Sequence, residues 1–120
     1  MHRTLICGSR TFNDEQLMFS ELNTGKHGYI HTVIHGGAAG ADSLAHDWAK
    51  TYARQVEIYQ ADWVHEGKKA GILRNIRMLE HGKPDQVIAF WDGKSPGTAH
   101  MIKISQEAGI PTVIVPFKSN

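Results

Sequence analysis

A glycine-rich segment is the part of this sequence whose residue types are best suited to bind an anion. The apolar run Val33-Ile34 leads into it, and apolar residues at helical spacing follow it. Glycines let the backbone approach a ligand closely, and the first N–H groups of a helix are free donors with a partial positive charge. The pattern therefore predicts a strand, a phosphate-binding loop and a helix. The predicted ligand-binding residues of this loop are Gly36, Gly37, Ala38, Gly40, Ala41 and Asp42.

An ordinary tight turn is the alternative interpretation of this loop, because glycine is common in turns. Two other apolar runs, 4–7 and 86–91, also end in small and polar residues, which favours binding. These are Gly8, Ser9 and Arg10 in the first case, and Trp91, Asp92, Gly93, Gly97 and Thr98 in the second. Ser9 and Thr98 have the alternative role of local caps.

Several side chains in and near these loops could contact a nucleotide. Arg10 and Arg74 suit bidentate recognition of phosphate, and the alternative for each is a solvated surface charge. Asp42 is either an acceptor for a ribose hydroxyl or a first-turn carboxylate favoured by the helix dipole. Trp63, in a connecting segment, is a better candidate for stacking on a base than Trp91, which is more typical of a core residue.

The elements that position these residues alternate along the chain. Five apolar runs, at 4–7, 32–35, 56–59, 86–91 and 111–116, are separated by four amphipathic stretches. Such alternation is typical of right-handed βαβ units with helices on both faces of a parallel sheet. The sequence thus predicts an α/β, Rossmann-like three-layer fold with a five-stranded parallel sheet and about four helices, in one domain spanning residues 1–120. Ligands of such sheets bind outside the carboxyl ends of the strands, so the three loops predict one extended crevice.

The predicted helices have recognisable starts and faces. The first begins at Asn13, which would form a capping box with Gln16. Residues 60–67 connect the third strand to the third helix. The inward residues are expected to be Ile72, Leu73, Ile76 and Leu79 in the third helix, and Met101, Ile102, Ser105 and Ala108 in the fourth.

Composition limits the class of partner. The formal net charge is +1, from 13 Lys and Arg against 12 Asp and Glu, so no field over the whole molecule gathers nucleic acid, and nucleic-acid binding is not expected. No window approaches membrane-spanning length, and no secretory segment is evident, which predicts no membrane partner. The one cysteine, Cys7, lies in an apolar run and fits a buried thiol in a reducing compartment, so we expect a cytoplasmic protein.

The order of these motifs resembles the SLOG superfamily, and within it the group of small Rossmann-like proteins related to YspA and cpYpsA. The resemblance covers nearly the whole chain. It is carried by the segments 8–12, 35–45, 62–75 and 90–98, the third of which includes the pair Arg74-Asn75. The resemblance implies a nucleotide-type ligand, such as one derived from NAD or ADP-ribose, and it adds Asn75 to the expected binding residues. Related small SLOG proteins also suggest a homo-oligomer.

The Lonely Guy phosphoribohydrolases and the DNA-processing protein DprA are more distant members of this superfamily. Gly36, Gly37 and Gly40 match the first glycine motif of the Lonely Guy enzymes, and Arg74 with Met78 is similar to their Arg-x-x-x-Met segment. Gly97-Thr98 matches the second motif.

The chain departs from the Lonely Guy enzymes after that second motif, because His100 and Met101 stand where their glutamates follow. A glycosidic-bond hydrolase needs a carboxylate, which leaves Asp42 and Asp92 as the catalytic candidates. The sequence favours binding without turnover over this hydrolase alternative.

Metal binding has little support in the sequence. Eight histidines are scattered along the chain without a dense ligand cluster such as His-Glu-x-x-His. We therefore predict neither a metal site nor a cofactor.

Overall fold

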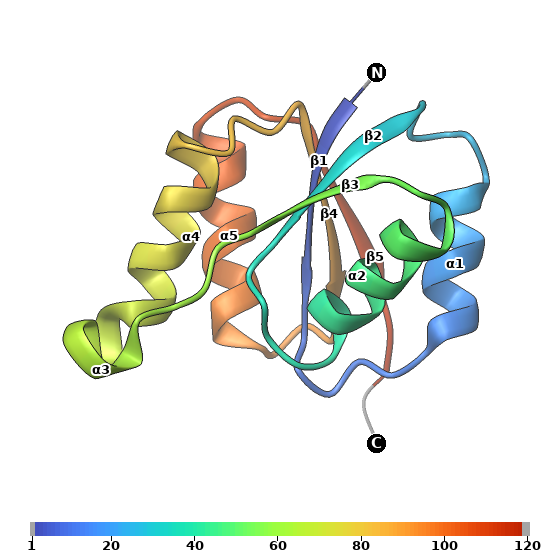
Figure 1. Cartoon of the computed structure of the whole chain (residues 1–120). Coiled ribbons are helices and arrows are strands. Elements are labelled where there is room, and N and C mark those ends of the chain that lie inside the picture. The colour runs from blue at the N-terminus through green and yellow to red at the C-terminus, as the bar shows by residue number, and fades with distance from the viewer. Residues whose placement is uncertain (1, 119–120) are drawn as a thin grey trace.

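The computed structural model describes residues 2–118 and contains a five-stranded parallel sheet between two layers of helices (Figure 1). The strand order is β3-β2-β1-β4-β5, and every neighbouring pair is parallel. The strands are β1 His2–Gly8, β2 Ile30–His35, β3 Gln55–Ile58, β4 Gln86–Trp91 and β5 Thr112–Pro116. The predicted Rossmann-like fold class is confirmed.

Two helices cover each face of the sheet (Figure 1). They are α1 Glu15–Asn23 and α2 Ala41–Thr51 on one face, and α4 Ala70–Glu80 and α5 Pro96–Glu107 on the other. Between β3 and α4 the chain forms the short helix α3, Trp63–Glu66, and a 3-10 turn η1, Gly67–Lys69. A two-pronged ion pair from Arg77 to Glu66, with N–O distances of 3.0 and 3.1 Å, joins α3 to α4.

Each face of the sheet has its own apolar cluster. The cluster under α1 and α2 includes Ile6, Phe12, Met18, Val33 and Trp48, and the cluster under α4 and α5 includes Leu5, Ile34, Met78, Ala89 and Met101. Neighbouring strand residues enter opposite clusters because side chains alternate across a strand. Cys7 lies in the second cluster, so the prediction of a buried thiol is confirmed. Among the described residues, no helix is both long enough and apolar enough to cross a membrane.

The predicted start of the first helix is wrong by one residue. Asp14, and not Asn13, is the N-cap, because its Oδ1 accepts a hydrogen bond from the Leu17 N–H at 2.9 Å. A carboxylate three residues before that N–H satisfies one of the donors left free by the first turn. Gln16 therefore has no role as the partner of Asn13 in a capping box.

The predicted inward face of α4 is also partly wrong. Ile72 is 49% exposed, whereas the buried residues are Ala70, Asn75 and Met78. On α4, Arg74 and Asn75 face the loops at the end of the sheet, where they bond to the Gly36 and Gly97 carbonyl oxygens. Ile72 therefore lies on the solvent side of the helix. In α5, Met101, Ile102 and Ser105 are buried as predicted, but Ala108 is exposed because it lies just past the end of the helix.

The carboxyl ends of the strands lie along one edge of the sheet, the lower edge in Figure 1. The loops after β1, β2 and β4 meet there. The strand order reverses between β1 and β4. All three loops that the sequence singled out are therefore at the edge where sheets of this type bind ligands.

Candidate functional site

A pocket of about 270 Å³ opens at the carboxyl ends of β1, β2 and β3. Its wall comes from the loops after these three strands and from α3 and α4. The wall residues are Arg10, Gly36, Gly37, Ala38, Ala39, Gln60, Ala61, Trp63 and Arg74. The pocket therefore brings together segments that are far apart in the sequence.

One side of the pocket combines a cation with an aromatic ring. The Arg10 Cζ lies 5.8 Å from the centroid of the Trp63 ring, and Trp63 is 50% exposed. Within residues 2–118 the Arg10 guanidinium has no hydrogen-bond partner, so its donors are available to a ligand. The exposed indole offers an apolar surface of the size of a nucleobase.

The second guanidinium of the pocket belongs to Arg74 on α4. Its Nη1 donates to the Gly36 carbonyl oxygen at 2.6 Å, and its Nε donates to Asn75 Oδ1 at 3.1 Å. Burial lowers the pKa of Arg74, while the negative charge of Asp42 acts in the opposite direction. A Cβ at Gly36 would collide with the Arg74 guanidinium, so any larger residue here would displace the end of this side chain.

The carboxylate of Asp42 is buried beneath the glycine loop. Its Oδ2 accepts hydrogen bonds from the Gly36 N–H at 3.1 Å and from the Ala38 N–H at 3.2 Å. Burial raises the pKa of Asp42 to about 6, and the two N–H groups, Arg74 and Arg10 limit the rise. Asp42 therefore holds the shape of the loop and is not itself part of the pocket wall.

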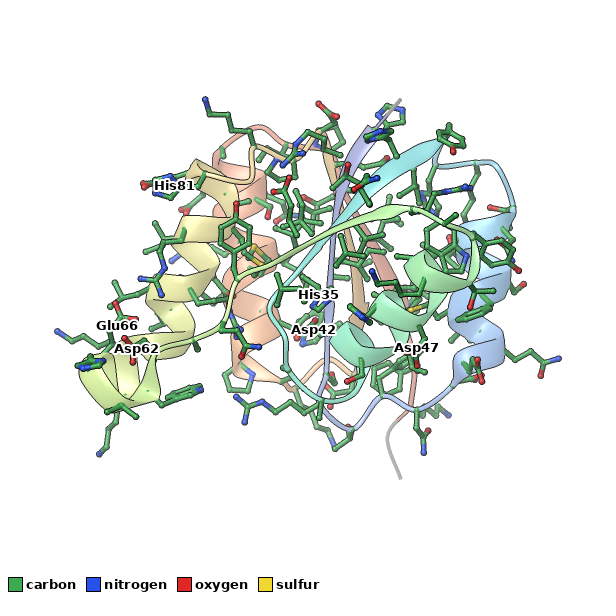
Figure 2. All side chains as sticks on the ribbon, in the orientation of Figure 1. His35, Asp42, Asp47, Asp62, Glu66 and His81 are labelled. Atoms are coloured by element: carbon green, nitrogen blue, oxygen red, sulfur yellow. The ribbon has the colours of Figure 1, made fainter. Side chains whose placement is uncertain are left out.

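His35, at the end of β2, supports the same loop (Figure 2). Its Nδ1 accepts a hydrogen bond from the Gly37 N–H at 3.0 Å, which leaves the ring proton on Nε2 to donate to His46 Nδ1 at 3.1 Å. Burial, together with His46 and Arg74, lowers the pKa of His35 to about 4. The histidine is therefore neutral at pH 7.

The loop after β4 is built around Asp92. Its Oδ1 accepts hydrogen bonds from the Lys94 N–H at 2.9 Å and the Ser95 N–H at 2.8 Å, and these lower the pKa of Asp92 to about 2. The hydroxyl oxygens of Ser95 and Ser9 lie 2.7 Å apart and link this loop to the loop after β1. This contact joins the two loops at the carboxyl ends of the paired strands β1 and β4, where the strand order reverses.

Comparison with known proteins identifies the family. Residues 2–65 match the YspA, cpYpsA-related SLOG family. The chain belongs to this family. It is also 41% identical over 122 residues to the Gene 61 protein of Mycobacterium phage D29, an alignment that covers 94% of this chain and 95% of the phage protein.

The part of the SLOG protein that matches the family contains almost all of the pocket wall. Arg10, the loop residues 36–39 and the segment from Gln60 to Trp63 all lie within residues 2–65. Arg74 lies beyond this segment. The pocket is therefore a feature of the matched region, completed by one arginine from α4.

The structure divides the predicted binding residues of the SLOG protein into two groups. Those in the pocket wall are Arg10, Gly36, Gly37, Ala38, Trp63 and Arg74. Those outside the wall are Gly8, Ser9, Gly40, Ala41, Asp42, Asn75, Trp91, Asp92, Gly93, Gly97 and Thr98. The three predicted loops share one edge, but only two of them line this pocket.

Several residues of the second group have contacts within the protein that explain them. The Trp91 Nε1–H donates to the Ser95 carbonyl oxygen at 3.1 Å, and the ring packs against the apolar cluster under α4 and α5. Asn75 Nδ2 donates to the Gly97 carbonyl oxygen at 3.2 Å and lies 3.1 Å from His100 Nδ1. These contacts join α4 to the start of α5.

Gln60, Ala61 and Ala39 are pocket residues that the sequence pattern did not indicate. The Gln60 amide lies over Gly37, where a Cβ would come within 3.1 Å of it. The only available signal was the position of Gln60 directly after a strand that neighbours β2. Among the described residues, no group of three His, Cys, Asp or Glu side chains is arranged to hold a metal ion.

Proposed function

We propose that this SLOG protein binds a nucleotide-type ligand in the pocket at the ends of β1, β2 and β3, as a sensor or a sequestering module. One observation carries the proposal. Two guanidinium groups, a half-exposed indole and an uncommitted amide converge on a single pocket of about 270 Å³.

The chemistry of the wall fits the parts of a nucleotide. Arg10 and Arg74 supply fixed positive charge for a phosphate or pyrophosphate. Trp63 offers a face on which a base stacks, an interaction that depends little on the identity of the base. The Gln60 amide has both donor and acceptor atoms for a base edge. Membership of the SLOG family independently suggests a nucleotide-related role.

Binding without turnover is favoured over hydrolysis of a glycosidic or phosphate bond. A phosphoribohydrolase-like reaction needs a carboxylate at the reacting bond. Asp42 is committed to the loop N–H groups, and Asp92 to the turn after β4, and neither lines the pocket. His100 and Met101 supply no carboxylate either.

We further propose that the protein acts as a cytoplasmic homo-oligomer. The exposed apolar side chains of Val64 and Ile72, beside the pocket residue Trp63, are suited to association between copies. A net charge of +1 argues against a nucleic-acid partner. Sedimentation of the purified protein tests the oligomer.

The experiment that tests the function is incubation with a panel of ligands. The panel contains adenine and guanine nucleotides, ADP-ribose and cyclic ADP-ribose, and bound and free fractions are separated and identified by mass spectrometry. Arg10→Ala is compared with Lys50→Ala, which removes the same charge from an exposed position near the far end of α2.

We expect an intact ligand in the bound fraction of the wild type and of Lys50→Ala, and a loss of at least tenfold in Arg10→Ala, about the value of one charge-assisted hydrogen bond. Free base or ribose phosphate accumulating with time would instead identify a hydrolase. Equal retention by all three proteins, or no retention by any, would contradict the proposal.

A further inference from the structure

The glycine loop directs three successive N–H groups toward the protein itself. Gly36 and Ala38 donate to the same oxygen of Asp42, and Gly37 donates to His35 Nδ1. A run of backbone N–H groups of this kind forms a nest suited to an anion. In this protein the anion in the nest is the buried carboxylate of Asp42, which is 6% exposed.

Because the N–H groups of residues 36–38 are bonded within the protein, this part of the loop contacts the pocket arginine through a carbonyl oxygen. The Gly36 oxygen accepts the hydrogen bond from Arg74 Nη1, and the Cβ that glycine lacks leaves room for the guanidinium. Arg74 Nε is held in turn by Asn75, which bonds to the Gly97 carbonyl on α5. Gly36 therefore connects Asp42 to Arg74, because its N–H bonds to the carboxylate and its carbonyl oxygen bonds to the guanidinium.

We propose that Arg10 and Arg74, and not the N–H groups of residues 36–38, bind the anionic group of the ligand. We further propose that Asp42 is a positioning residue, which fixes Arg74 through the backbone of Gly36. The ligand group is a phosphate ester, an anion whose oxygen geometry matches the guanidinium donors. This assignment of the ligand rests on the proposed function. The coupling of Asp42 to Arg74 is a property of the protein without ligand and is tested separately.

Three variants test whether Asp42 positions Arg74 or only stabilises the fold. Asp42→Ala removes the acceptor of two N–H groups, and Asp42→Asn keeps an oxygen that both groups can reach. Asp47→Ala is the matched control, because Asp47 carries the same charge on the exposed side of α2 (Figure 2).

The readouts are the backbone amide and arginine Nε–H resonances of the full chain, recorded without ligand and during titration with 5′-AMP or inorganic phosphate. In the wild type we expect the Arg10 and Arg74 Nε–H resonances to shift with either probe, while the amides of residues 36–38 change little. Large shifts of those three amides, with the arginines unaffected, would assign the anion to the loop and overturn the proposal. The proposal also fails if neither probe moves the two arginine resonances.

The coupling is read from the variants before any ligand is added. We expect the Arg74 Nε–H resonance to move in Asp42→Ala and to stay in place in Asp42→Asn and Asp47→Ala, with AMP binding weakened about tenfold in Asp42→Ala alone. An Arg74 resonance that is unchanged in Asp42→Ala refutes the positioning role whether or not a nucleotide binds. If Asp42→Ala does not fold, the wild-type titration still decides which groups hold the anion.

Discussion

The loops after β2 and β4 each donate two backbone N–H groups to an aspartate, Asp42 in the first turn of α2 and Asp92 in the loop after β4. The two carboxyl groups nevertheless have opposite pKa shifts. The pKa of Asp42 is raised to about 6, and that of Asp92 is lowered to about 2. The local hydrogen bonds favour the charged form in both loops. The difference comes from burial, because Asp42 is 6% exposed beneath the pocket while Asp92 is partly open to solvent.

The two loops also differ in what they hold in place. The loop after β2 holds Arg74 at the pocket, whereas the loop after β4 bonds to Ser9 in the loop after β1. A glycine motif at the end of a parallel strand therefore does not by itself indicate a ligand site. The side chains that reach the loop from other elements decide its role.

The largest effect in this comparison is expected from one glycine in each region. Gly36→Ala forces the Arg74 guanidinium from its place, and we expect a loss of about 2 to 3 kcal/mol in the free energy of unfolding, together with loss of ligand binding. Gly97→Ala meets no atom within 4 Å and should stay within about 0.5 kcal/mol of the wild type. Urea denaturation measures both. Equal stability of the two variants would mean that Arg74 moves without cost.

A smaller effect is expected from the two aspartates. Asp42→Ala leaves two N–H groups without an acceptor, one of them on the buried Gly36, and should cost about 2 kcal/mol. Asp92→Ala leaves the N–H groups of Lys94 and Ser95 free to bind water, so we expect a much smaller loss of stability and unchanged ligand binding. Denaturation and calorimetric titration check this pair. A larger loss in Asp92→Ala would show that the contact between the loops after β1 and β4 contributes more to stability than the pocket loop.

The smallest effect concerns pH, because Asp42 and His35 act in opposite directions. The raised pKa of Asp42 means that its contribution to stability falls as pH rises from about 4 to about 6. The lowered pKa of His35 means that its contribution falls as pH drops from about 6.5 to about 4. The contributions of this pair therefore largely cancel in the wild type.

Substituting one residue of the pair should reveal how the other makes the free energy of unfolding depend on pH. In Asp42→Asn only the contribution of His35 remains, so the protein becomes more stable as pH rises from about 4 to about 6.5. His35→Asn keeps an acceptor for the Gly37 N–H and leaves the pH dependence of Asp42, so that stability falls between pH 4 and pH 6 by about 2 kcal/mol relative to the wild-type curve. His46, Arg74 and Arg10 surround the pair and are unchanged in both variants. If the free energy of unfolding depends on pH in the same way in the wild type and the variants between pH 4 and 6.5, the two pKa shifts are refuted.

The sequence was informative wherever a contact is local or periodic. The run 86–91 coincides with β4, because consecutive apolar residues next to glycine and proline are typical of a buried parallel strand. The face of α4 could not be predicted in the same way. Its inward stripe includes Asn75, whose partner Gly97 is 22 residues away, and no period reveals such a partner.

By itself, the sequence determined the alternation of strands and helices, the glycine loop after β2, and the presence of Arg10 and Trp63 near the ends of strands. These follow from side-chain period and backbone freedom, which act over a few residues. Only the tertiary structure decided that Arg74 reaches Gly36, 38 residues away, that Gln60 covers Gly37, and that Asp42 is buried beneath the loop. Those facts depend on which elements pack together, since a carboxylate or a guanidinium acquires its role from the neighbours and the burial that packing gives it.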